Sequence, residues 1–240
     1  MKTAIITGGT SGIGLAAAKI FSADGFNCVL VGRSRERFDN IRSQLNGRVE
    51  FIAADVRNVD ECNRIVAGTV KIFGGVDVLI NSAGIYHEGA IVDTGAEIFD
   101  DIFATNVRGT FFTSRAAVGE LIKRRGSIVN VASDAGLRGN YFCAAYAASK
   151  GAVVAFTKSL ALELASFPVR VNCVAPGDVL TPLTVNQLQS GATVDELAKI
   201  YPLGRIATAD EVASAIHFLA SSAASFITGA VLCVDGGLTA

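Results

Sequence analysis

Short apolar runs alternate along this chain with longer segments that have the period of a helix. The apolar runs are mostly continuous and rich in Val and Ile, as expected for strands buried on both faces of a parallel sheet. They fall at residues 3–7, 28–31, 49–53, 76–80, 127–131, 169–174 and 231–234. The helical segments lie between them, at residues 14–23, 34–45, 59–73, 111–123, 147–165 and 209–220. This alternation predicts an α/β fold with a doubly wound, seven-stranded parallel sheet and helices on both faces.

No linker, repeat or low-complexity tract divides the chain, so its 240 residues predict a single Rossmann-type domain. We expect a dinucleotide-binding part over about residues 1–130 and a catalytic and substrate-binding part over about residues 131–240. One interval is irregular, and it contains Pro176, Gly177, Pro182, Gly191, Pro202 and Gly204. Long loops in compact domains often bind ligands, so we expect a substrate loop over about residues 178–207, with a plain surface insertion as the alternative.

A glycine-rich loop follows the first predicted strand and leads into the first predicted helix. Its sequence, Thr7 to Gly14, spaces its glycines differently from the common G-x-G-x-x-G fingerprint. Glycines let a backbone approach a pyrophosphate, and a helix N-terminus offers it free N–H groups. The alternative is a glycine turn without a ligand. The residues that we expect to contact a dinucleotide are Gly8, Thr10, Ser11, Gly12, Ile13 and Gly14.

The end of the second predicted strand bears on the choice of cofactor. An acidic residue at such a position binds the adenosine ribose hydroxyls of NAD. Here the position holds Gly32, followed by Arg33 and Ser34. No carboxylate repels a 2′-phosphate there, and Arg33 could pair with it through charge-assisted hydrogen bonds. The sequence therefore favours NADP(H) over NAD(H), although a solvated basic first turn of a helix would look the same.

Further polar and small residues follow the third and fourth predicted strands. Asp55 and Val56 come after the third, and the Asp55 carboxylate could accept the adenine amino group or serve as an N-cap. Asn81, Ala83 and Gly84 come at the end of the fourth, where small residues would let the chain pass close to the cofactor and Asn81 could brace the sheet end. All these positions lie at carboxyl ends of strands, where ligands bind in open α/β sheets.

Tyr146 and Lys150 stand four residues apart in a predicted helix, so their side chains lie on one face. An ammonium beside a phenol favours the phenolate, whereas tyrosine alone titrates near ~10. The spacing is common, and a surface pair is the alternative. Ser133 and Asn106 lie upstream and complete a set of residue types suited to proton transfer and to stabilising a developing oxyanion.

With these motifs together, the chain resembles the short-chain dehydrogenase/reductase family in its single-domain form. The resemblance covers nearly the whole length and is carried by residues 7–14, 81–84, 106, 133, 146–150, 176–177, 181 and 235–237. The segments Pro202–Arg205, Asp210–Ala213 and Phe218–Ser221 are most similar to 3-oxoacyl-carrier-protein reductases and their relatives. The resemblance implies hydride transfer between NADP(H) and a ketone or secondary alcohol.

The resemblance also assigns roles to individual residues. Tyr146 would be the general acid in carbonyl reduction and the base in the reverse direction, and Ser133 would hydrogen-bond the substrate oxygen. Lys150 would bind the nicotinamide ribose and favour the tyrosinate, and Asn106 would hold a water that links Lys150 to solvent. Thr181 would contact the nicotinamide carboxamide. The remaining residues implied at the cofactor are Pro176, Gly177 and Val179.

Several positions depart from the family pattern. Asp178 stands where relatives carry a bulky apolar residue, which suggests a polar substrate, a hydrogen bond that orders the loop, or a solvent-facing carboxylate. The segment between Ser133 and Tyr146 also holds polar residues, namely Asp134, Arg138 and Asn140. A carrier protein is weakly supported: Lys123–Arg125 could bind an acidic partner near the cleft, but Ser166–Pro168 lacks the family's other arginine. No role follows for His87 and Glu88.

Oxidation of a sugar, polyol or other secondary alcohol is therefore the alternative reaction. A cofactor-binding protein without catalysis is a further alternative, against which the complete set of Asn106, Ser133, Tyr146 and Lys150 argues. Extended-family dehydratases and epimerases need a larger second domain, and enoyl reductases space Tyr and Lys further apart.

Composition excludes several other classes. The net charge of −1 argues against nucleic acid as a partner, and no apolar run reaches membrane-spanning length. The five cysteines show no C-x-x-C pair and no metal-ligand spacing, so we expect no metal site. With no secretory segment before the first strand, we expect a cytoplasmic protein. The segment 147–165 is apolar on more than one face, which suits a helix in a homotetramer or dimer.

Overall fold

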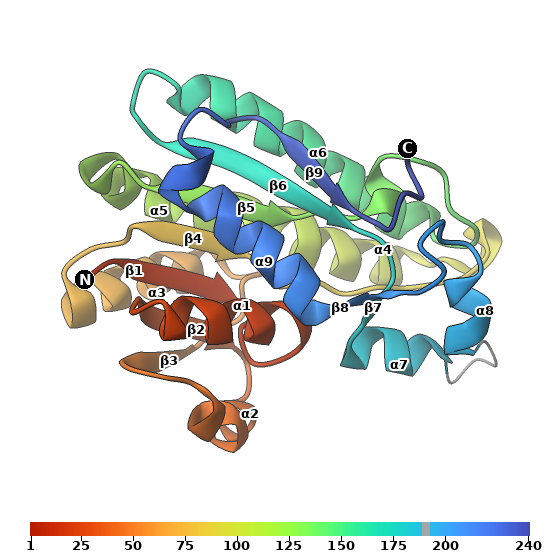
Figure 1. The fold of residues 1–240 in the computed structure, drawn as a ribbon, viewed down its shortest axis with the longest axis horizontal. Helices are drawn as coiled ribbons and strands as arrows, with labels where there is room; N and C mark the ends of the chain where they lie inside the picture. Colours follow the sequence, from red (N-terminus) through yellow and green to blue (C-terminus); the bar gives the residue numbers. More distant parts are fainter. Residues whose placement is uncertain (189–192) are drawn as a thin grey trace.

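Continuous runs of Val and Ile form a parallel sheet at the centre of the protein, in a computed structural model that describes residues 1–188 and 193–240 (Figure 1). Within these residues the sheet has seven strands in the order β3-β2-β1-β4-β5-β6-β9. The strands are β1 (Thr3–Thr7), β2 (Asn27–Gly32), β3 (Val49–Ala53), β4 (Val78–Asn81), β5 (Ser127–Val131), β6 (Arg170–Pro176) and β9 (Val231–Val234). Every neighbouring pair is parallel, which confirms the predicted doubly wound sheet.

Helices cover both faces of this sheet, as predicted. The α-helices of the described residues are α1 (Gly12–Ala23), α2 (Arg35–Ile41), α3 (Val59–Phe73), α4 (Ala96–Phe103), α5 (Thr110–Arg124), α6 (Ala144–Leu164), α7 (Pro182–Leu188), α8 (Val194–Ala198) and α9 (Ala209–Ala220). A π-helical segment over Ala104–Gly109 joins α4 to α5. Because α1 and α9 bury side chains against one face while α3, α5 and α6 bury theirs against the other, the protein has three layers.

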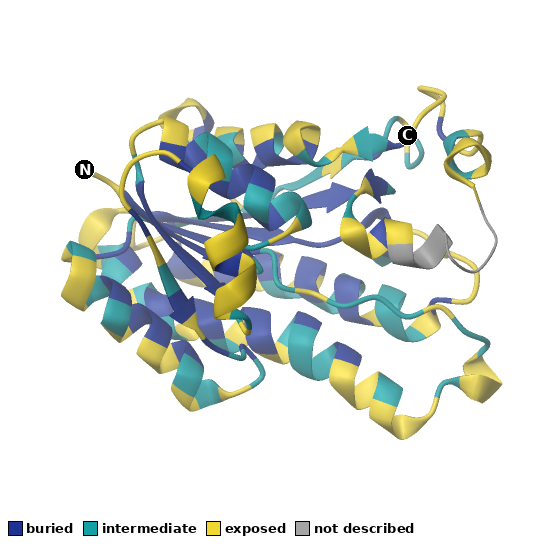
Figure 2. Ribbon diagram, turned by 90° about the horizontal axis from the view of Figure 1, so that it is seen from below, coloured by how far each residue is buried: buried dark blue, intermediate teal, exposed yellow. Residues whose placement is uncertain are grey.

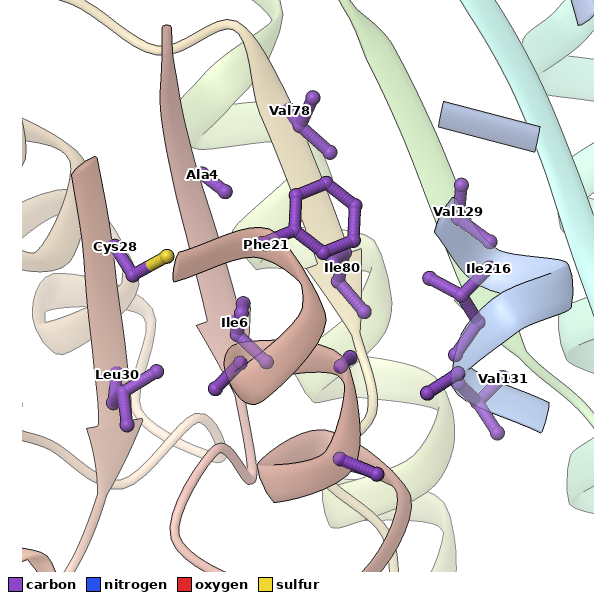
Figure 3. Close-up of a cluster of buried hydrophobic side chains, with 14 of the residues drawn as sticks. Ala4, Ile6, Phe21, Cys28, Leu30, Val78, Ile80, Val129, Val131 and Ile216 are labelled. Atoms are coloured by element: carbon purple, nitrogen blue, oxygen red, sulfur yellow. The ribbon is translucent and has the colours of Figure 1, made fainter. Parts of the chain in front are cut away.

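Successive side chains of each strand point to opposite faces of the sheet, and this divides the hydrophobic core into two parts. Ala4 and Ile6 of β1 point toward α1 and α9, where they meet Phe21 and Ile216 (Figure 3). Ile5, between them in sequence, points to the other face with side chains of α3, α5 and α6. Figure 2 shows the result: buried residues follow the strands, and exposed residues lie on the outer sides of the helices. Both faces of the sheet are therefore shielded from water, which leaves the ends of the strands for ligands to approach.

Some boundaries differ from the predicted ones. The predicted helix 34–45 ends at Ile41 and continues as a 3₁₀ turn over Arg42–Gln44, and α6 begins three residues earlier than predicted. The short helix α4 was not predicted, because its eight residues are too few for a helical period to stand out in the sequence. Tyr146 therefore lies in the first turn of α6 rather than ahead of it.

The irregular interval is more ordered than its prolines and glycines suggest. It contains α7 and α8, and a two-stranded parallel sheet of β7 (Val179–Leu180) and β8 (Ala207–Thr208) closes its base. Gly191, one of the residues that marked the interval, lies outside the described residues. Within the described ranges no helix is both long and apolar enough to cross a membrane.

Helix α3 offers a matched test of this packing. Ile65 is fully buried against the sheet, whereas Ile72 on the same helix is 40% exposed. We expect Ile65→Ala to lower the free energy of unfolding by about 2–5 kcal/mol through lost burial and the cavity it leaves. Ile72→Ala should change it by less than about 1 kcal/mol. Urea unfolding of both variants checks this, and equal losses would contradict the assigned orientation of α3.

Candidate active site

A pocket opens at the carboxyl edge of the sheet, where the loops after β1, β4, β5 and β6 meet. It brings together many of the residues selected from the sequence. Those lining it are Gly8, Ser11, Gly12, Ile13, Ala83, Gly84, Ser133, Tyr146, Lys150, Pro176, Gly177, Val179 and Thr181. Ser82, Asp134, Asn140 and Asp178 line it too. Segments far apart in sequence therefore converge on one cavity because parallel strands end at the same edge.

The glycine loop is shaped by close backbone contacts. Gly8 and Gly12 have φ values of +65° and +51°, in the left-handed region that favours glycine. A Cβ on Gly14 would lie 2.3 Å from the Gly8 carbonyl oxygen, so this position has no room for a side chain. Ser11 precedes α1 without a side-chain capping bond, which leaves first-turn N–H groups open to an anion. These features fit the pyrophosphate of a dinucleotide.

Thr10 and the residues after β2 lie together, at the end where the sequence predicts the adenosine. A Cβ added to Gly32 would lie 3.4 Å from the hydroxyl oxygen of Thr10. Ser34 caps α2 by accepting the Arg37 N–H, and Arg33 beside it is exposed. This end lies outside the pocket described above, as do Asp55 and Val56.

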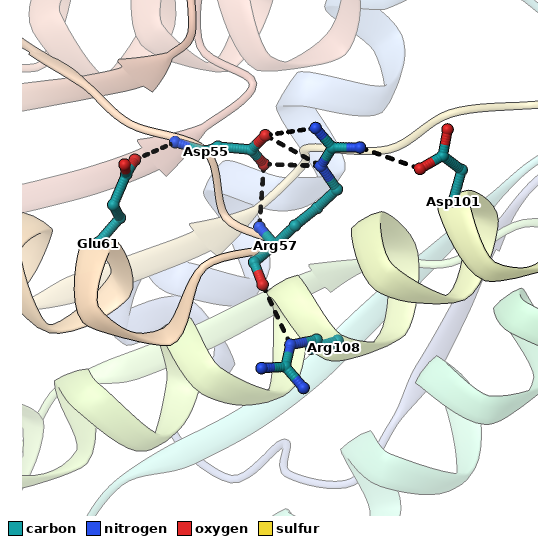
Figure 4. A network of polar contacts seen from close by, with 5 residues as sticks. All are labelled: Asp55, Arg57, Glu61, Asp101 and Arg108. Carbon is teal, nitrogen blue, oxygen red and sulfur yellow. Dashed lines mark hydrogen bonds and ion pairs between the residues drawn. The ribbon is translucent and has the colours of Figure 1, made fainter. Parts of the chain in front are cut away.

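Asp55 is held by a charge network rather than by a helix end (Figure 4). Its Oδ2 accepts hydrogen bonds from both Nε and Nη2 of Arg57, at 2.9 Å and 2.7 Å, and Arg57 Nη1 also pairs with Asp101 at 2.9 Å. These bonds to Arg57 hold the pKa of Asp55 below its usual range. The N-cap alternative for Asp55 is wrong, because Asn58 caps α3.

Val56 is packed in the core. Its side chain is buried, and a Cβ on Gly109 of the π-helical segment would lie 2.7 Å from it. Any contact of Val56 with a cofactor would therefore come from its backbone.

Buried side chains brace the loop after β4. Asn81 donates to Ser114 at 2.9 Å and to Asn130 at 2.8 Å, which ties the end of β4 to β5 and α5. The Thr7 hydroxyl oxygen accepts the N–H groups of Ser82 and Ala83, each at 3.1 Å. These bonds fix Ala83 and Gly84 beside the glycine loop. Sequence reasoning did not select Thr7, Ser114 or Asn130, since their partners lie more than thirty residues away.

Asn106 lies in the π-helical segment, a local distortion often found at functional sites. Its Oδ1 accepts the N–H of Ile85 at 2.9 Å. Its Nδ2 donates to the carbonyl of Ile85 and to the hydroxyl of Ser149, each at 3.0 Å. Both Asn106 and Lys150 lie next to Gly84, where an added Cβ would be 3.2 Å from the Asn106 Oδ1 and 3.5 Å from the Lys150 Nζ. The water relay between them remains a prediction.

Ser133, Tyr146 and Lys150 face the pocket from β5 and α6. Ser133 donates to Asp134 Oδ1 at 2.9 Å, and Lys150 Nζ donates to the Val131 carbonyl at 2.9 Å. Lys150 Nζ lies 5.7 Å from the centre of the Tyr146 ring, and the Tyr86 ring packs edge-on against Tyr146 at 4.8 Å. The i, i+4 pair is therefore a pocket pair, and the surface-pair alternative is wrong.

Burial dominates the proton affinities of this pair. It lowers the pKa of Lys150 to about 8. It raises the pKa of Tyr146 well above its ordinary value, against the smaller effect of Ser133, and the charge of Asp134 raises it further. The expectation that Lys150 favours the tyrosinate stays a prediction, because desolvation outweighs the effect of an ammonium that is hydrogen-bonded to the Val131 carbonyl.

The residues that departed from the family pattern have distinct environments. Asp178 lines the pocket, its N–H donates to the Tyr201 hydroxyl at 2.6 Å, and burial raises the pKa of its carboxyl. Tyr201, which sequence reasoning missed, is buried and packs on Gly177. Glu88 accepts a hydrogen bond from Tyr86, while neither it nor His87 is among the residues lining the pocket.

The basic segment at the end of α5 is not near the cleft. Arg124 and Arg125 border a cavity with Lys2 and Ser127, where β1 and β5 begin, and Lys123 pairs with Glu120 at 2.6 Å. Because the pocket lies where the same strands end, the expectation that Lys123–Arg125 sits beside it within one chain is wrong.

The site and fold define a nucleotide-dependent oxidoreductase, and comparisons with known proteins agree. The family model described as enoyl-(acyl carrier protein) reductase matches residues 8–239. The chain is 39% identical to the 3-oxoacyl-[acyl-carrier-protein] reductase FabG of Thermotoga maritima over 241 residues, covering 99% of this chain and 97% of that protein.

Two solved structures are similar to this chain over almost its whole length. A short-chain dehydrogenase/reductase from Brucella melitensis, described as glucose/ribitol dehydrogenase, superposes with a TM-score of 0.94 at 38% identity, covering 100% of this chain and 97% of that chain. ElxO with NADP bound gives a TM-score of 0.93 at 34% identity, covering 99% and 98%. The chain belongs to the short-chain dehydrogenase/reductase family and is an NAD(P)-dependent oxidoreductase acting on CH–OH groups.

The lowered pKa of Lys150 predicts a pH-dependent stability. The folded value of about 8 lies below the roughly 10.4 of an unfolded chain, so unfolding takes up a proton between these values. The free energy of unfolding of the wild type should therefore rise between about pH 8 and pH 10 relative to that of Lys150→Met. Urea unfolding of both proteins at about pH 7 and about pH 10 measures this, and a difference independent of pH would contradict it.

Proposed function

We propose that the protein reduces a ketone with NADPH, using Tyr146 as the general acid. The observation that carries this is the convergence of Ser133, Tyr146 and Lys150 on the pocket beside the glycine loop. Because the pKa of Tyr146 is raised, its phenol carries a proton at neutral pH, as a general acid must before the reaction. In this proposal about residues 1–130 hold the cofactor and about residues 131–240 hold the substrate, with the segment 178–207 over it.

The side chains divide the reaction between them. NADPH supplies the hydride when it is bound. Ser133 donates a hydrogen bond to the carbonyl oxygen as negative charge develops there, and Tyr146 delivers its proton to the same oxygen. Lys150 binds the nicotinamide ribose and stabilises the phenolate left on Tyr146, and Asn106 holds the water that returns a proton. Thr181, which lies against Gly12, orients the nicotinamide carboxamide.

A preference for NADP(H) rests on the end of β2. Gly32 leaves no carboxylate at the ribose position, and Arg33 is exposed beside it. Asp55, whose carboxyl pKa the charge of Arg33 also lowers slightly, is paired with Arg57. Similarity to ElxO with NADP bound supports this preference.

The substrate we infer is polar and uncharged. Asp134 and Asp178 both line the pocket, and two carboxylates there disfavour an anionic substrate. A 3-oxoacyl group on a carrier protein remains weakly supported, since Lys123–Arg125 lies at the opposite edge of the sheet. Oxidation of a sugar or polyol is the second candidate, favoured by the same polar wall and by the similarity to the Brucella protein.

We also infer a cytoplasmic homotetramer or homodimer. Four of the five free cysteines are buried, which suits a reducing compartment. Large apolar side chains remain on the outside of a single chain: Phe111 on α5 is 45% exposed, and Leu162 on α6 is 81% exposed. Contact with a second copy would remove this surface from water.

Arg33→Ala tests the cofactor assignment. Charge-assisted bonds to a 2′-phosphate contribute about 1.5–3 kcal/mol, so we expect the Kd for NADPH to rise about 10-fold or more while NADH binding stays unchanged. Arg35→Ala is the matched control, because Arg35 is already paired with Asp39 at 3.0 Å. Fluorescence titration at constant salt measures all three proteins. Equal NADPH and NADH binding by the wild type would overturn the preference.

Tyr146→Phe tests the chemistry. We expect kcat for ketone reduction to fall at least about 100-fold, since the proton donor is removed, with NADPH binding retained. The assay screens polar ketones and 3-oxoacyl thioesters with NADPH, and polyols with NADP⁺, by following cofactor absorbance. Unchanged turnover in the variant would remove Tyr146 from the mechanism, and activity confined to polyols would favour the second candidate.

A further inference from the structure

One contact in the pocket is not used by the proposed reaction. Ser133 Oγ donates to Asp134 Oδ1 at 2.9 Å and accepts the Ala135 N–H at 3.2 Å. A serine hydroxyl has a single proton to donate. Ser133 also interacts with Tyr146 and lowers the pKa of its phenol, and donation to Asp134 competes with this hydrogen bond and with one to a substrate oxygen.

Two partners hold Asp134 in position. The residue is 5% exposed and begins a 3₁₀ turn over Asp134–Gly136. A buried carboxylate is unfavourable unless it is paired and hydrogen-bonded. Ser133 supplies the hydrogen bond, and Arg138 supplies a counter-charge, with its Nε 3.6 Å from Asp134 Oδ2.

The groups around Tyr146 give Asp134 its effect. Besides Ser133 and Asp134 at the end of β5, they are Lys150 on α6, Cys143 before α6, Tyr86 after β4 and Asp178 between β6 and β7. Glu88 lies behind Tyr86 and bonds its hydroxyl. The charges of two carboxylates, Asp134 and Asp178, thus disfavour ionisation of Tyr146. Asp134 also accepts the hydrogen bond of Ser133, the donor that a Tyr146 phenolate would need.

We propose that Asp134 is a positioning residue that holds the Ser133 proton and thereby keeps Tyr146 in the phenol form. The inference rests on the proposed function, in which Tyr146 must carry a proton to act as an acid. Ionising Tyr146 would place a phenolate in competition with the Asp134 carboxylate for the one Ser133 proton. The arrangement favours reduction over oxidation. It also means that a carbonyl oxygen draws Ser133 away from Asp134 only as its own negative charge grows.

Asp134→Asn tests this without a substrate. Asparagine keeps the shape but removes the charge that makes Asp134 the stronger acceptor, so Ser133 can turn to Tyr146. We expect Tyr146 to ionise at a pH lower by about one unit or more. The readout is tyrosinate ultraviolet absorbance of each protein minus that of the same protein carrying Tyr146→Phe. The chain has four tyrosines and no tryptophan, which makes this difference measurable.

Two further variants separate this effect from simple damage. Arg138→Gln removes the cation beside Asp134, so Tyr146 should ionise at a pH no lower than in the wild type. A pocket that was merely loosened would instead lower the pH of Tyr146 ionisation in both Asp134→Asn and Arg138→Gln. Asp178→Asn removes a carboxylate that does not bond Ser133 and should give a smaller shift than Asp134→Asn. An unchanged titration in Asp134→Asn, or a shift no larger than that of Asp178→Asn, would overturn the proposal.

Turnover distinguishes this inference from the proposed function. If the proposed function and the role of Asp134 both hold, kcat/KM for ketone reduction falls at a lower alkaline pH in Asp134→Asn. That pH shifts by the same amount as the pH of Tyr146 ionisation. If the titration shifts but no carbonyl compound is reduced by the wild type, the proposed reaction fails and the role of Asp134 stands. If reduction occurs and neither the titration nor the limb moves, the role of Asp134 fails.

Discussion

Buried hydrogen bonds at the carboxyl ends of β1, β4 and β5 hold the whole site in place. Thr7 accepts two N–H groups from the loop after β4, and Asn81 reaches across to Asn130. Asn130 in turn donates to Thr157 of α6 at 2.9 Å, on the helix that carries Tyr146 and Lys150. A buried polar group left without its partner costs about 1–3 kcal/mol, so none of these loops can shift independently. The positions of the pocket residues depend on this network.

The same burial sets the chemistry of the pocket. Removing Tyr146 and Lys150 from water favours the neutral form of each, which raises the pKa of Tyr146 and lowers that of Lys150 to about 8. The negative charges of Asp134 and Asp178, which line the same pocket, raise the pKa of Tyr146 further. The proton on Tyr146 is thus retained first by burial and then by the two carboxylates of the wall.

The fold could be predicted, and so could the meeting of many proposed site residues in one pocket, because their signals are local. Runs of Val and Ile mark strands buried on both faces, and the ends of those strands name the residues that meet at the edge. The contacts that depend on long-range packing could not be predicted, including the bond of Tyr201 to Asp178 and the network of Asp55, Arg57 and Asp101. Sequence spacing likewise predicted that Tyr146 and Lys150 are close together, but not that burial raises the pKa of Tyr146 and lowers that of Lys150.

The restraints on the pocket are unequal. The network that joins Thr7, Asn81 and Asn130 leaves the side beside the glycine loop little freedom. The other side, where we propose that the substrate binds, is formed by the 3₁₀ turn after Ser133 and by the interval that begins at Asp178, which β7 and β8 tie at its base. Substitutions there can change the polarity of the wall without disturbing the sheet edge. In this chain the wall holds two partly or fully buried carboxylates, Asp134 and Asp178, which supports the proposal of a substrate that offers hydroxyl groups and carries no negative charge.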